Sequence, residues 1–396
     1  MSGIRALIVC FVAVAALQAQ GTLPSGSTRT ACPRCAWTAP VTPRTVRVTT
    51  VAQLEAAART AQPGTTILVG DGHYRLTSML DIAAPHVVLR GESGDAARVV
   101  LHGDGMTERR VGVAISVSAP DVAIADLTAG FVGYHGIQVR GERGASRTVL
   151  HNVHVLDTGQ QLVKGSVASG RVHADDGLVA CSLFEYTDHA PSSYTNGVDI
   201  LAGRGWTVRD NRFERIRGPA SGRWAAGPAV LFWANSQDTV VERNVIVDSF
   251  RGIALGLGPG GSDLARDGER VIDHQGGRIR NNTVVNLHAW ADEGIEANSA
   301  PGVSIENNTV LTEGSVNWSI SLRFPATGAT VRNNLTSLPI VLRNGGRAEL
   351  EGNVEGARSD WFVNAPAGDL RLNLAHREVL RAGAFEFGPT APGAAR

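Results

Sequence analysis

The chain repeats one short phrase from its middle to its end. Two or three strand-forming residues precede an asparagine, and another apolar pair usually follows it. The anchor positions of this phrase are Asn152, Asn211, Asn244, Asn282, Asn308, Asn334 and Asn353. Successive anchors lie 59, 33, 38, 26, 26 and 19 residues apart, and Ser182 divides the first interval. Repeats of this length predict a solenoid, in which each repeat buries its apolar face only against its neighbours.

The repeat unit consists of strands. Val, Ile and Leu alternate with polar residues over short runs that end in Gly, Asn or Pro, and this alternation is typical of β-strands. We therefore predict an all-β parallel β-helix with rungs about 4.8 Å apart. The anchor asparagines are expected to be structural. Asparagine tolerates the left-handed conformation at a corner, and stacked amides can hydrogen-bond from rung to rung.

The ends of the chain suggest four segments. Residues 1–19 are typical of a secretory signal, because Arg5 precedes an apolar run and a small residue follows. Residues 20–44 are rich in Pro, Thr and Ser and are interpreted as a linker. We expect one β-helix domain over residues 45–388 and a flexible tail over residues 389–396. Thr50 and Gln53 predict a capping box for a helix over roughly residues 51–61, which would cover the first open rung.

The sequence also resembles a known family. The Asn-punctuated rungs, and the opening VTTVAQLEAAARTAQPGTTILVGDGHYRLTSMLDIAAPHVVLRGESG, resemble the pectate-lyase-like right-handed parallel β-helix superfamily. That opening is similar to the start of its chondroitinase and alginate lyase branch. The resemblance covers about residues 45–388 and implies a right-handed solenoid with a catalytic groove over one sheet. It leaves the reaction open, because this fold hosts lyases, hydrolases, esterases, epimerases and adhesins.

Composition restricts the partners and the compartment. The 37 basic and 37 acidic side chains balance, so no global field favours nucleic acid, and no apolar run is long enough to span a membrane. We expect a secreted monomer, extracellular or periplasmic, that meets an acidic polysaccharide through local charges. Cys32 and Cys35 form a lone CxxC pair, whereas Cys181 stands alone. In an exported protein we expect that pair to be a local disulfide or two unused thiols.

The strand that precedes each asparagine phrase predicts one functional face. When the apolar positions of these strands are aligned inward, alternation directs the intervening residues outward on one sheet. These residues are Gln138, Arg140, Lys164, Asp199, Trp233, Glu296, Asn298, Ser321, Arg323 and Arg343. Among them we predict substrate-binding roles for Gln138, Asp199, Trp233, Glu296, Asn298 and Arg323.

Lys164 is the first candidate for catalysis. It is the only lysine of the chain, and its segment GQQLVKGS is similar to the VKS-type segment that supplies a lysine base in the chondroitinase and alginate lyase branch. A lysine can lose its proton when burial or neighbouring cations depress its pKa, and Arg140 would be such a cation. The alternative is a structural lysine, either solvated or paired with Asp199.

The corresponding chemistry is β-elimination on a uronate-containing polysaccharide. A base removes the C5 proton once the adjacent carboxylate is neutralised, and an acid protonates the leaving oxygen. Lys164 would be the base, Arg140 or Arg323 would neutralise the carboxylate, and His189 or Tyr194 would deliver the proton. The resemblance also makes Ca²⁺ a possible cofactor. Gln160 and Gln161 stand where acidic ligands would be expected, however, and hard cations prefer carboxylates.

Two alternatives remain open. TNGVDI (residues 195–200) is similar to the NTDGIDI segment of polygalacturonase-type hydrolases, but Asn196 replaces the first aspartate. Inverting hydrolysis needs two carboxylates about 6.5–9.5 Å apart, whereas Asp199 and Glu296 are expected three rungs, or roughly 14 Å, apart. The second alternative is a non-catalytic carbohydrate-binding or surface protein, with Trp224, Trp233 and Trp290 as stacking rings for sugars.

Overall fold

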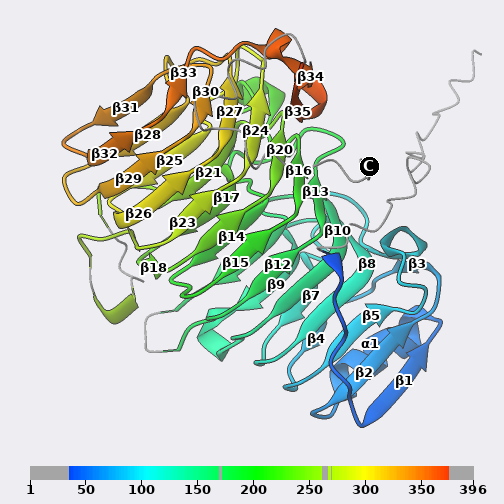
Figure 1. Cartoon of the computed structure of the whole chain (residues 1–396). Helices are drawn as coiled ribbons and strands as arrows, with labels where there is room; N and C mark the ends of the chain where they lie inside the picture. The colour runs from blue at the N-terminus through cyan, green and yellow to red at the C-terminus, as the bar shows by residue number, and fades with distance from the viewer. Residues whose placement is uncertain (1–34, 169–171, 261–265, 269, 374–396) are drawn as a thin grey trace, which may run out of the picture. The chain divides into compact units, whose positions relative to one another are not determined.

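The computed structural model describes residues 35–168, 172–260, 266–268 and 270–373. The predicted secretory signal, the predicted tail and Cys32 lie outside these residues. The described chain forms the predicted parallel β-helix, with stacked all-parallel sheets and a single short α-helix near the start (Figure 1). Within this part of the chain, no helix has the length and apolar character needed to cross a membrane.

One sheet carries the predicted functional face. Its strands follow one another in chain order along the stack in Figure 1, and each pairs in parallel with the next. They are β4 (Leu80–Ile82), β7 (Val113–Val117), β9 (His135–Arg140), β11 (Val163–Ser166), β14 (Val198–Leu201), β17 (Pro228–Trp233), β21 (Arg251–Leu255), β25 (Ile295–Asn298), β28 (Ile320–Arg323) and β31 (Ile340–Arg343). We call it the ten-stranded sheet.

The remaining parallel strands form two ladders that share the long strands β8 and β10. The first ladder contains β1 (Arg44–Val48), β2 (Thr65–Val69), β5 (Val88–Gly91), β8 (Ala123–Val132), β10 (Val149–Thr158), β12 (Leu178–Ala180), β15 (Thr207–Arg209), β19 (Val240–Glu242), β23 (Arg278–Arg280), β26 (Pro301–Glu306), β29 (Gly328–Arg332) and β32 (Arg347–Glu351). The second contains β3 (Gly72–Arg75), β6 (Val99–His102), β8, β10, β13 (Leu183–Glu185), β16 (Arg212–Glu214), β20 (Val245–Val247), β24 (Thr283–Asn286), β27 (Thr309–Thr312), β30 (Leu335–Thr336) and β33 (Val354–Glu355).

Shorter elements complete the solenoid. The parallel pair β18 (Ser236–Gln237) and β22 (His274–Gln275) lies outside the main ladders, and β34 (Phe362–Asn364) pairs antiparallel with β35 (Asp369–Leu372). The 3-10 turns are η2 (Ala96–Arg98), η3 (Gly141–Arg143), η4 (Ala220–Gly222), η5 (Arg266–Gly268), η6 (Ser359–Trp361) and η7 (Ala365–Ala367).

The predicted helical cap is confirmed. Helix α1 spans Val51–Thr60, and the Thr50 side chain accepts a hydrogen bond from the backbone N of Gln53 at 3.3 Å. Gln53 Oε1 in turn accepts from the backbone N of Thr49 at 2.9 Å, one residue before the position expected for a capping box. Leu54 and Ala58 are the buried residues of this helix, so its apolar side packs on the core.

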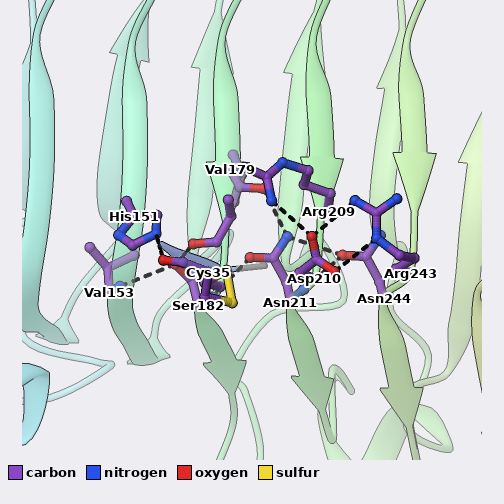
Figure 2. The surroundings of a disulfide bond; sticks show 12 residues. Cys35, His151, Val153, Val179, Ser182, Arg209, Asp210, Asn211, Arg243 and Asn244 are labelled. Carbon is purple, nitrogen blue, oxygen red and sulfur yellow. Dashed lines mark hydrogen bonds and ion pairs between the residues drawn. A yellow bond between two sulfur atoms is a disulfide. The ribbon is translucent and has the colours of Figure 1, made fainter. Parts of the chain in front are cut away.

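The predicted asparagine ladder is also confirmed. The side-chain Nδ2 of each ladder asparagine from Asn211 to Asn334 donates to the Oδ1 of the next ladder asparagine at 2.9–3.0 Å. The same Oδ1 accepts from the preceding anchor's backbone N at 3.0–3.1 Å. The ladder extends to Ser182, whose backbone N donates to Asn211 Oδ1 at 3.0 Å (Figure 2).

Two details of the predicted ladder were wrong. The left-handed residue at each corner is the one before the ladder asparagine: Cys181, Asp210, Arg243, Asn281, Asn307 and Asn333 have φ values of 52–56°. Asn152 belongs to this corner column, with φ 50°, and it is not a ladder member. Val153 takes the ladder position instead, because its backbone N donates to Ser182 Oγ. The chain turns at the left-handed residue, and the next side chain is thereby directed into the buried ladder.

The predicted local disulfide at the CxxC pair was wrong as well. Cys35 is bonded to Cys181, 146 residues away in sequence (Figure 2). Cys181 occupies the corner column that also contains the ion-paired Asp210 and Arg243, so its side chain can be reached from outside the rung. The segment around Cys35 runs beside β10, where the Cys35 carbonyl oxygen lies 3.0 Å from His151 Nε2. The partner of Cys35 is therefore determined by the corner beside which its segment lies, and not by the spacing of the cysteines in the sequence.

Candidate functional site

The predicted alignment of the ten-stranded sheet is confirmed strand by strand. Gln138, Lys164 and Asp199 are Cα partners on consecutive strands β9, β11 and β14. The inward residues Ile137, Val163, Val198, Val230, Ile253, Ile295 and Ile320 are at most 1% exposed. Leu342 on the last rung differs, with 47% exposure, because no further strand of this sheet covers it among the residues that the structure describes. The outward residues therefore form columns along one face of the solenoid.

Four of the predicted residues meet at one place, which we call the Lys164 centre. Lys164 Nζ donates to Asp199 Oδ2 at 2.6 Å and to the Tyr194 hydroxyl oxygen at 2.7 Å. Trp233 Nε1 donates to Asp199 Oδ1 at 2.8 Å. Lys164, Asp199 and Trp233 come from outward positions on β11, β14 and β17, and Tyr194 comes from the connection that precedes β14.

Exposure differs sharply within the Lys164 centre. Lys164 is 7% exposed and Asp199 is fully buried, whereas Tyr194 is 46% exposed. Both oxygens of Asp199 are hydrogen-bonded, so this carboxylate anchors Lys164 and Trp233. Tyr194 is therefore the most exposed member of the centre.

The protonation of Lys164 differs from the expectation for a base. Burial alone would lower the pKa of Lys164, but the charge of Asp199 and the contact with Tyr194 oppose burial, and the net pKa is raised. Lys164 is consequently an ammonium at neutral pH. The sequence left two alternatives for Lys164, a base with a depressed pKa or an ion pair with Asp199. The structure contains the ion pair.

Sequence reasoning missed His135 in this region, and it considered Gln161 only in relation to a metal site. Burial, assisted by the charge of Lys164, lowers the pKa of His135 to about 4, so its imidazole is neutral at pH 7. Among the described residues, His135 Nδ1 has no hydrogen-bond partner, and neither amide atom of the fully buried Gln161 has one. The signal was present in YHGIQVR, because His135 begins the strand that pairs with the strand of Lys164.

Two predicted catalytic residues lie apart from these contacts. Arg140 Nε donates to Ser116 Oγ at 2.9 Å, and its Nη1 lies 3.3 Å from Glu142 Oε1. The ring of His189 packs on Trp224, with 4.1 Å between the ring centroids. Gln138 lies beside Lys164 in the register, and its Nε2 donates to Ser166 Oγ at 3.4 Å.

The other predicted substrate-binding residues form a second group on the same sheet. Glu296 and Asn298 lie on β25, three strands after Asp199, and Arg323 is the Cα partner of Asn298 on β28. Asn298 Nδ2 donates to Glu296 Oε2 at 2.8 Å, and Arg251 Nη1 lies 3.6 Å from Glu296 Oε1. The predicted outward face thus carries two groups of polar side chains.

The tryptophans of the binding hypothesis pack against other side chains. Trp224 and Trp290 lie with ring centroids 5.9 Å apart, and His288 stacks on Trp290 at 5.2 Å. The Arg217 guanidinium lies 4.6 Å from the centroid of Trp224. These side chains lie in the connections that precede β17 and β25.

The donor set near Lys164 does not fit Ca²⁺. Asp199 is already bonded to Lys164 and Trp233, and the neighbouring Gln161 offers only a neutral amide. In the part of the chain that the structure describes, no three His, Cys, Asp or Glu side chains gather as metal ligands would. Calcium prefers several carboxylate or carbonyl oxygens, so no step of the chemistry below uses a metal.

The arrangement defines a parallel β-helix, and solved structures have a similar fold. Pectate lyase Pel9A aligns with a TM-score of 0.51 at 13% identity, over 84% of this chain and 90% of that chain. Alginate lyase from Paenibacillus sp. strain FPU-7 aligns with a TM-score of 0.48 at 15% identity, over 77% of this chain and 99% of that chain. An alginate lyase in complex with a trisaccharide gives 0.44 at 15% identity, over 82% of this chain and 62% of that chain.

No protein-family model matches the chain, and no curated protein matches it. The resemblance inferred from the asparagine-punctuated rungs is confirmed at the level of the fold. At 13% identity, the likeness to pectate lyase Pel9A concerns the fold alone.

Proposed function

We propose that this protein is a secreted polysaccharide lyase that cleaves a uronate-containing polysaccharide by β-elimination at the Lys164 centre. The observation that carries the proposal is the contact between a buried ammonium and a half-exposed phenol on the outward face of the sheet. Lys164 donates to the Tyr194 oxygen at 2.7 Å, so the hydrogen of the phenol itself is free to be donated to another acceptor. Elimination requires such a donor at the leaving oxygen.

Each role follows from the charge state of the group. Lys164, held as a cation by Asp199, would neutralise the uronate carboxylate and so acidify the C5 proton. His135 would accept that proton, because its imidazole is neutral at pH 7 and its strand pairs with the strand of Lys164. The C5 electrons would form the C4–C5 double bond while the C4–O bond breaks, and Tyr194 would protonate the departing oxygen. Tyr194 and His135 would then return to their initial states by proton exchange with water.

Export is supported by the covalent structure. Cys35 and Cys181 form a disulfide between segments far apart in sequence, and such bonds persist in oxidising compartments. Together with the signal-like residues 1–19, this supports a periplasmic or extracellular location. A monomer that binds an acidic polysaccharide remains part of the proposal.

The proposal is tested by incubating the protein with a panel of uronate polymers and following the ultraviolet absorbance of the unsaturated product. A lyase generates that absorbance, a hydrolase generates reducing ends without it, and a binding protein only retains the polymer. Tyr194→Phe is expected to lower kcat by about a hundredfold or more, the usual contribution of a general acid. Tyr74→Phe is a matched control, because Tyr74 donates to Gly70 O near the cap, on another strand ladder.

The base is tested by the pH dependence of kcat/KM. If His135 accepts the proton, the acid limb of the kcat/KM profile should appear only as the pH drops toward about 4, the pKa of His135 in this structure. If Lys164 were the base, activity would instead keep rising into the alkaline range, since the pKa of Lys164 is raised above its ordinary value of 10.5. Full activity of His135→Asn would exclude the histidine.

A further inference from the structure

The second polar group on the ten-stranded sheet contains more unsatisfied polar atoms than a packing role explains. We call it the β25–β28 patch, and it comprises Arg251, Asp292, Glu293, Glu296, Asn298, Trp318, Ser321, Arg323 and Arg343. Within the described residues, four of its buried side-chain atoms have no hydrogen-bond partner: Glu296 Oε1, Asn298 Oδ1, Trp318 Nε1 and Arg323 Nε. Buried polar atoms are nearly always paired, so a cluster of exceptions needs an explanation.

The unpaired atoms belong to one place. Ile295, Glu296 and Asn298 on β25 are Cα partners of Ile320, Ser321 and Arg323 on β28, and Trp318 stands just before β28. Glu296 is 2% exposed and Asn298 is fully buried, although both occupy outward positions. Two of the unpaired atoms, on Trp318 and Arg323, are donors, and a protonated Glu296 would be a third. Such a set suits a ligand rich in acceptor oxygens.

The arginines of the patch are held in place. Arg343 Nη1 donates to Glu293 Oε1 at 2.9 Å, and its guanidinium lies 4.0 Å from the centroid of Trp318. Ser321 Oγ also donates to Glu293, so this carboxylate is fully engaged. Arg251 Nε donates to Asp292 Oδ2 at 2.6 Å. The patch thus has two carboxylates that are hydrogen-bonded to arginines, and Glu296 as a third, whose Oε1 lies 3.6 Å from Arg251 Nη1.

The charge of Glu296 decides the net charge of the patch. Arg251, Arg323 and Arg343 face Asp292 and Glu293, which leaves one net positive charge when Glu296 is protonated and none when it is ionised. Burial is the main cause that raises the pKa of Glu296 to about 7, and the negative charges of Glu293 and Asp292 raise it further. The positive charge of Arg251 opposes them and lowers this pKa. The patch should therefore bind an anion more tightly after Glu296 has taken up a proton.

From this geometry we propose that the β25–β28 patch is a second subsite for an anionic sugar unit of the polymer, and that filling it is coupled to protonation of Glu296. The inference rests on the proposed function, because it assumes a uronate polymer lying along the sheet. The patch is three rungs, or roughly 14 Å, from the Lys164 centre. A polymer along the solenoid axis would occupy both, with its carboxylates near Arg323 and Arg251 and its hydroxyls bonded to Asn298 and Glu296.

The coupling has a definite sign. A protonated Glu296 is neutral, so affinity for the anionic unit is high below pH 7 and falls as the pH rises through about 7. One linked proton limits this fall to about tenfold per pH unit. Glu296→Gln is neutral at every pH and should bind the polymer with an affinity that no longer falls over this range.

The test measures KM and kcat separately from pH 5.5 to 8.5 on the uronate polymer that the protein cleaves, in the wild-type protein, Glu296→Gln and Glu351→Gln. Glu351 is an exposed carboxylate on β32, outside the ten-stranded sheet, and its variant controls for loss of one negative charge. We expect the rise of KM with pH to vanish in Glu296→Gln alone, with kcat little changed. Arg323→Ala should raise KM about tenfold or more without a matching loss of kcat.

The outcomes separate the two proposals. If the wild-type protein cleaves the polymer but KM has the same pH dependence in Glu296→Gln, the subsite is excluded and the lyase function stands. If no uronate polymer is cleaved, direct binding of galacturonate and mannuronate hexamers to wild-type protein and Glu296→Gln decides: loss of the pH dependence in the variant supports the subsite, and equal binding excludes it. Thermal unfolding of each variant checks that a loss of binding is not a loss of fold.

Discussion

At the scale of single residues, the Lys164 centre is governed by one buried ion pair. Removing charges from water is costly, and the attraction between them offsets that cost only when the geometry is good. Here the 2.6 Å contact between Lys164 and Asp199 is supplemented by the bonds from Trp233 and to Tyr194. Because either charge alone would be buried without a partner, the two residues are expected to be energetically coupled.

We predict that coupling from a double-mutant cycle. Lys164→Met and Asp199→Asn should each lower the free energy of unfolding by about 3–5 kcal/mol, because each leaves an uncompensated buried charge. The double variant should be more stable than the sum of the two losses implies, by at least about 1 kcal/mol. Urea unfolding of the four proteins measures this. Strict additivity would show that the ion pair is not formed in solution.

Glu296 should give the protein a distinctive pH dependence of stability. The pKa of Glu296 is raised from 4.5 to about 7 in the folded protein, so the folded state binds its proton more tightly than the unfolded state does. The resulting stabilisation is complete below about pH 4.5 and is lost as the pH rises to about 7. At about 1.4 kcal/mol per pKa unit, the loss amounts to roughly 3 kcal/mol.

Glu296→Gln should lack this loss. Relative to the wild-type protein, the variant is expected to gain stability as the pH rises from 4.5 to 7.5, as measured by denaturant unfolding at each pH. His135 contributes with the opposite sign, because its pKa of about 4 lies below the ordinary 6.5, so its share of the stability is lost as the pH falls through that range. A constant difference between variant and wild type would contradict the environment described for Glu296.

At the scale of elements, the asparagine ladder holds one edge of every rung from β12 to β33. Asn282 illustrates its geometry: it is 1% exposed, and its Nδ2 donates to Val241 O at 2.9 Å and to Asn308 Oδ1 at 3.0 Å. Its Oδ1 accepts from both the backbone N and Nδ2 of Asn244. One side chain therefore satisfies polar groups on two neighbouring rungs.

The loss in free energy of unfolding when a ladder asparagine is replaced should depend on its position along the ladder. Asn282→Ala leaves several buried groups unpaired, at about 1–3 kcal/mol each, and is expected to cost about 3 kcal/mol or more. Asn353→Ala, at the half-buried last position, should cost about 1 kcal/mol, because water can replace the lost bonds. Asn282→Ser should recover part of the loss, since Ser182 already serves the same purpose for Val153. Denaturant midpoints measure all three, and equal costs at both positions would contradict the ladder.

The ladder also illustrates what the sequence can and cannot predict. The period, the strand faces and the outward columns of the ten-stranded sheet follow from alternation, because a one-residue slip would move every side chain to the other face. The left-handed corner could not be assigned to one of two adjacent asparagines, since Asn281 and Asn282 carry the same side chain. The charge state of Lys164 depends on the burial of Asp199. This burial results from the packing of the connections around the strand, which alternation does not predict. The contacts of His189 with Trp224 and of Arg140 with Ser116 likewise depend on other segments of the chain.

At the scale of the whole solenoid, stability accumulates from rung to rung, because each repeat contacts only its neighbours. A covalent bond between distant parts of such a chain acts beyond one interface. The disulfide joins Cys35, ahead of β1, to Cys181, which follows β12. It therefore connects the segment before the cap to a rung in the middle of the sequence. The stacking of Trp37 on His151, with centroids 5.0 Å apart, lies along the same path.

We predict that opening this bond weakens the whole solenoid and not only its first residues. In the chain-entropy model, a disulfide that closes a loop of this length stabilises the folded protein by at most about 5 kcal/mol. Measured stabilisations by disulfides are commonly about 2–4 kcal/mol. Reduction, or the double variant Cys35→Ser with Cys181→Ser, should therefore lower the midpoint of denaturant unfolding by a corresponding amount. Cys32→Ser is the matched control, because it alters the neighbouring cysteine and leaves the Cys35–Cys181 bond intact. If Cys32→Ser destabilised the protein and Cys181→Ser did not, the pairing would be the local one that the CxxC spacing suggests.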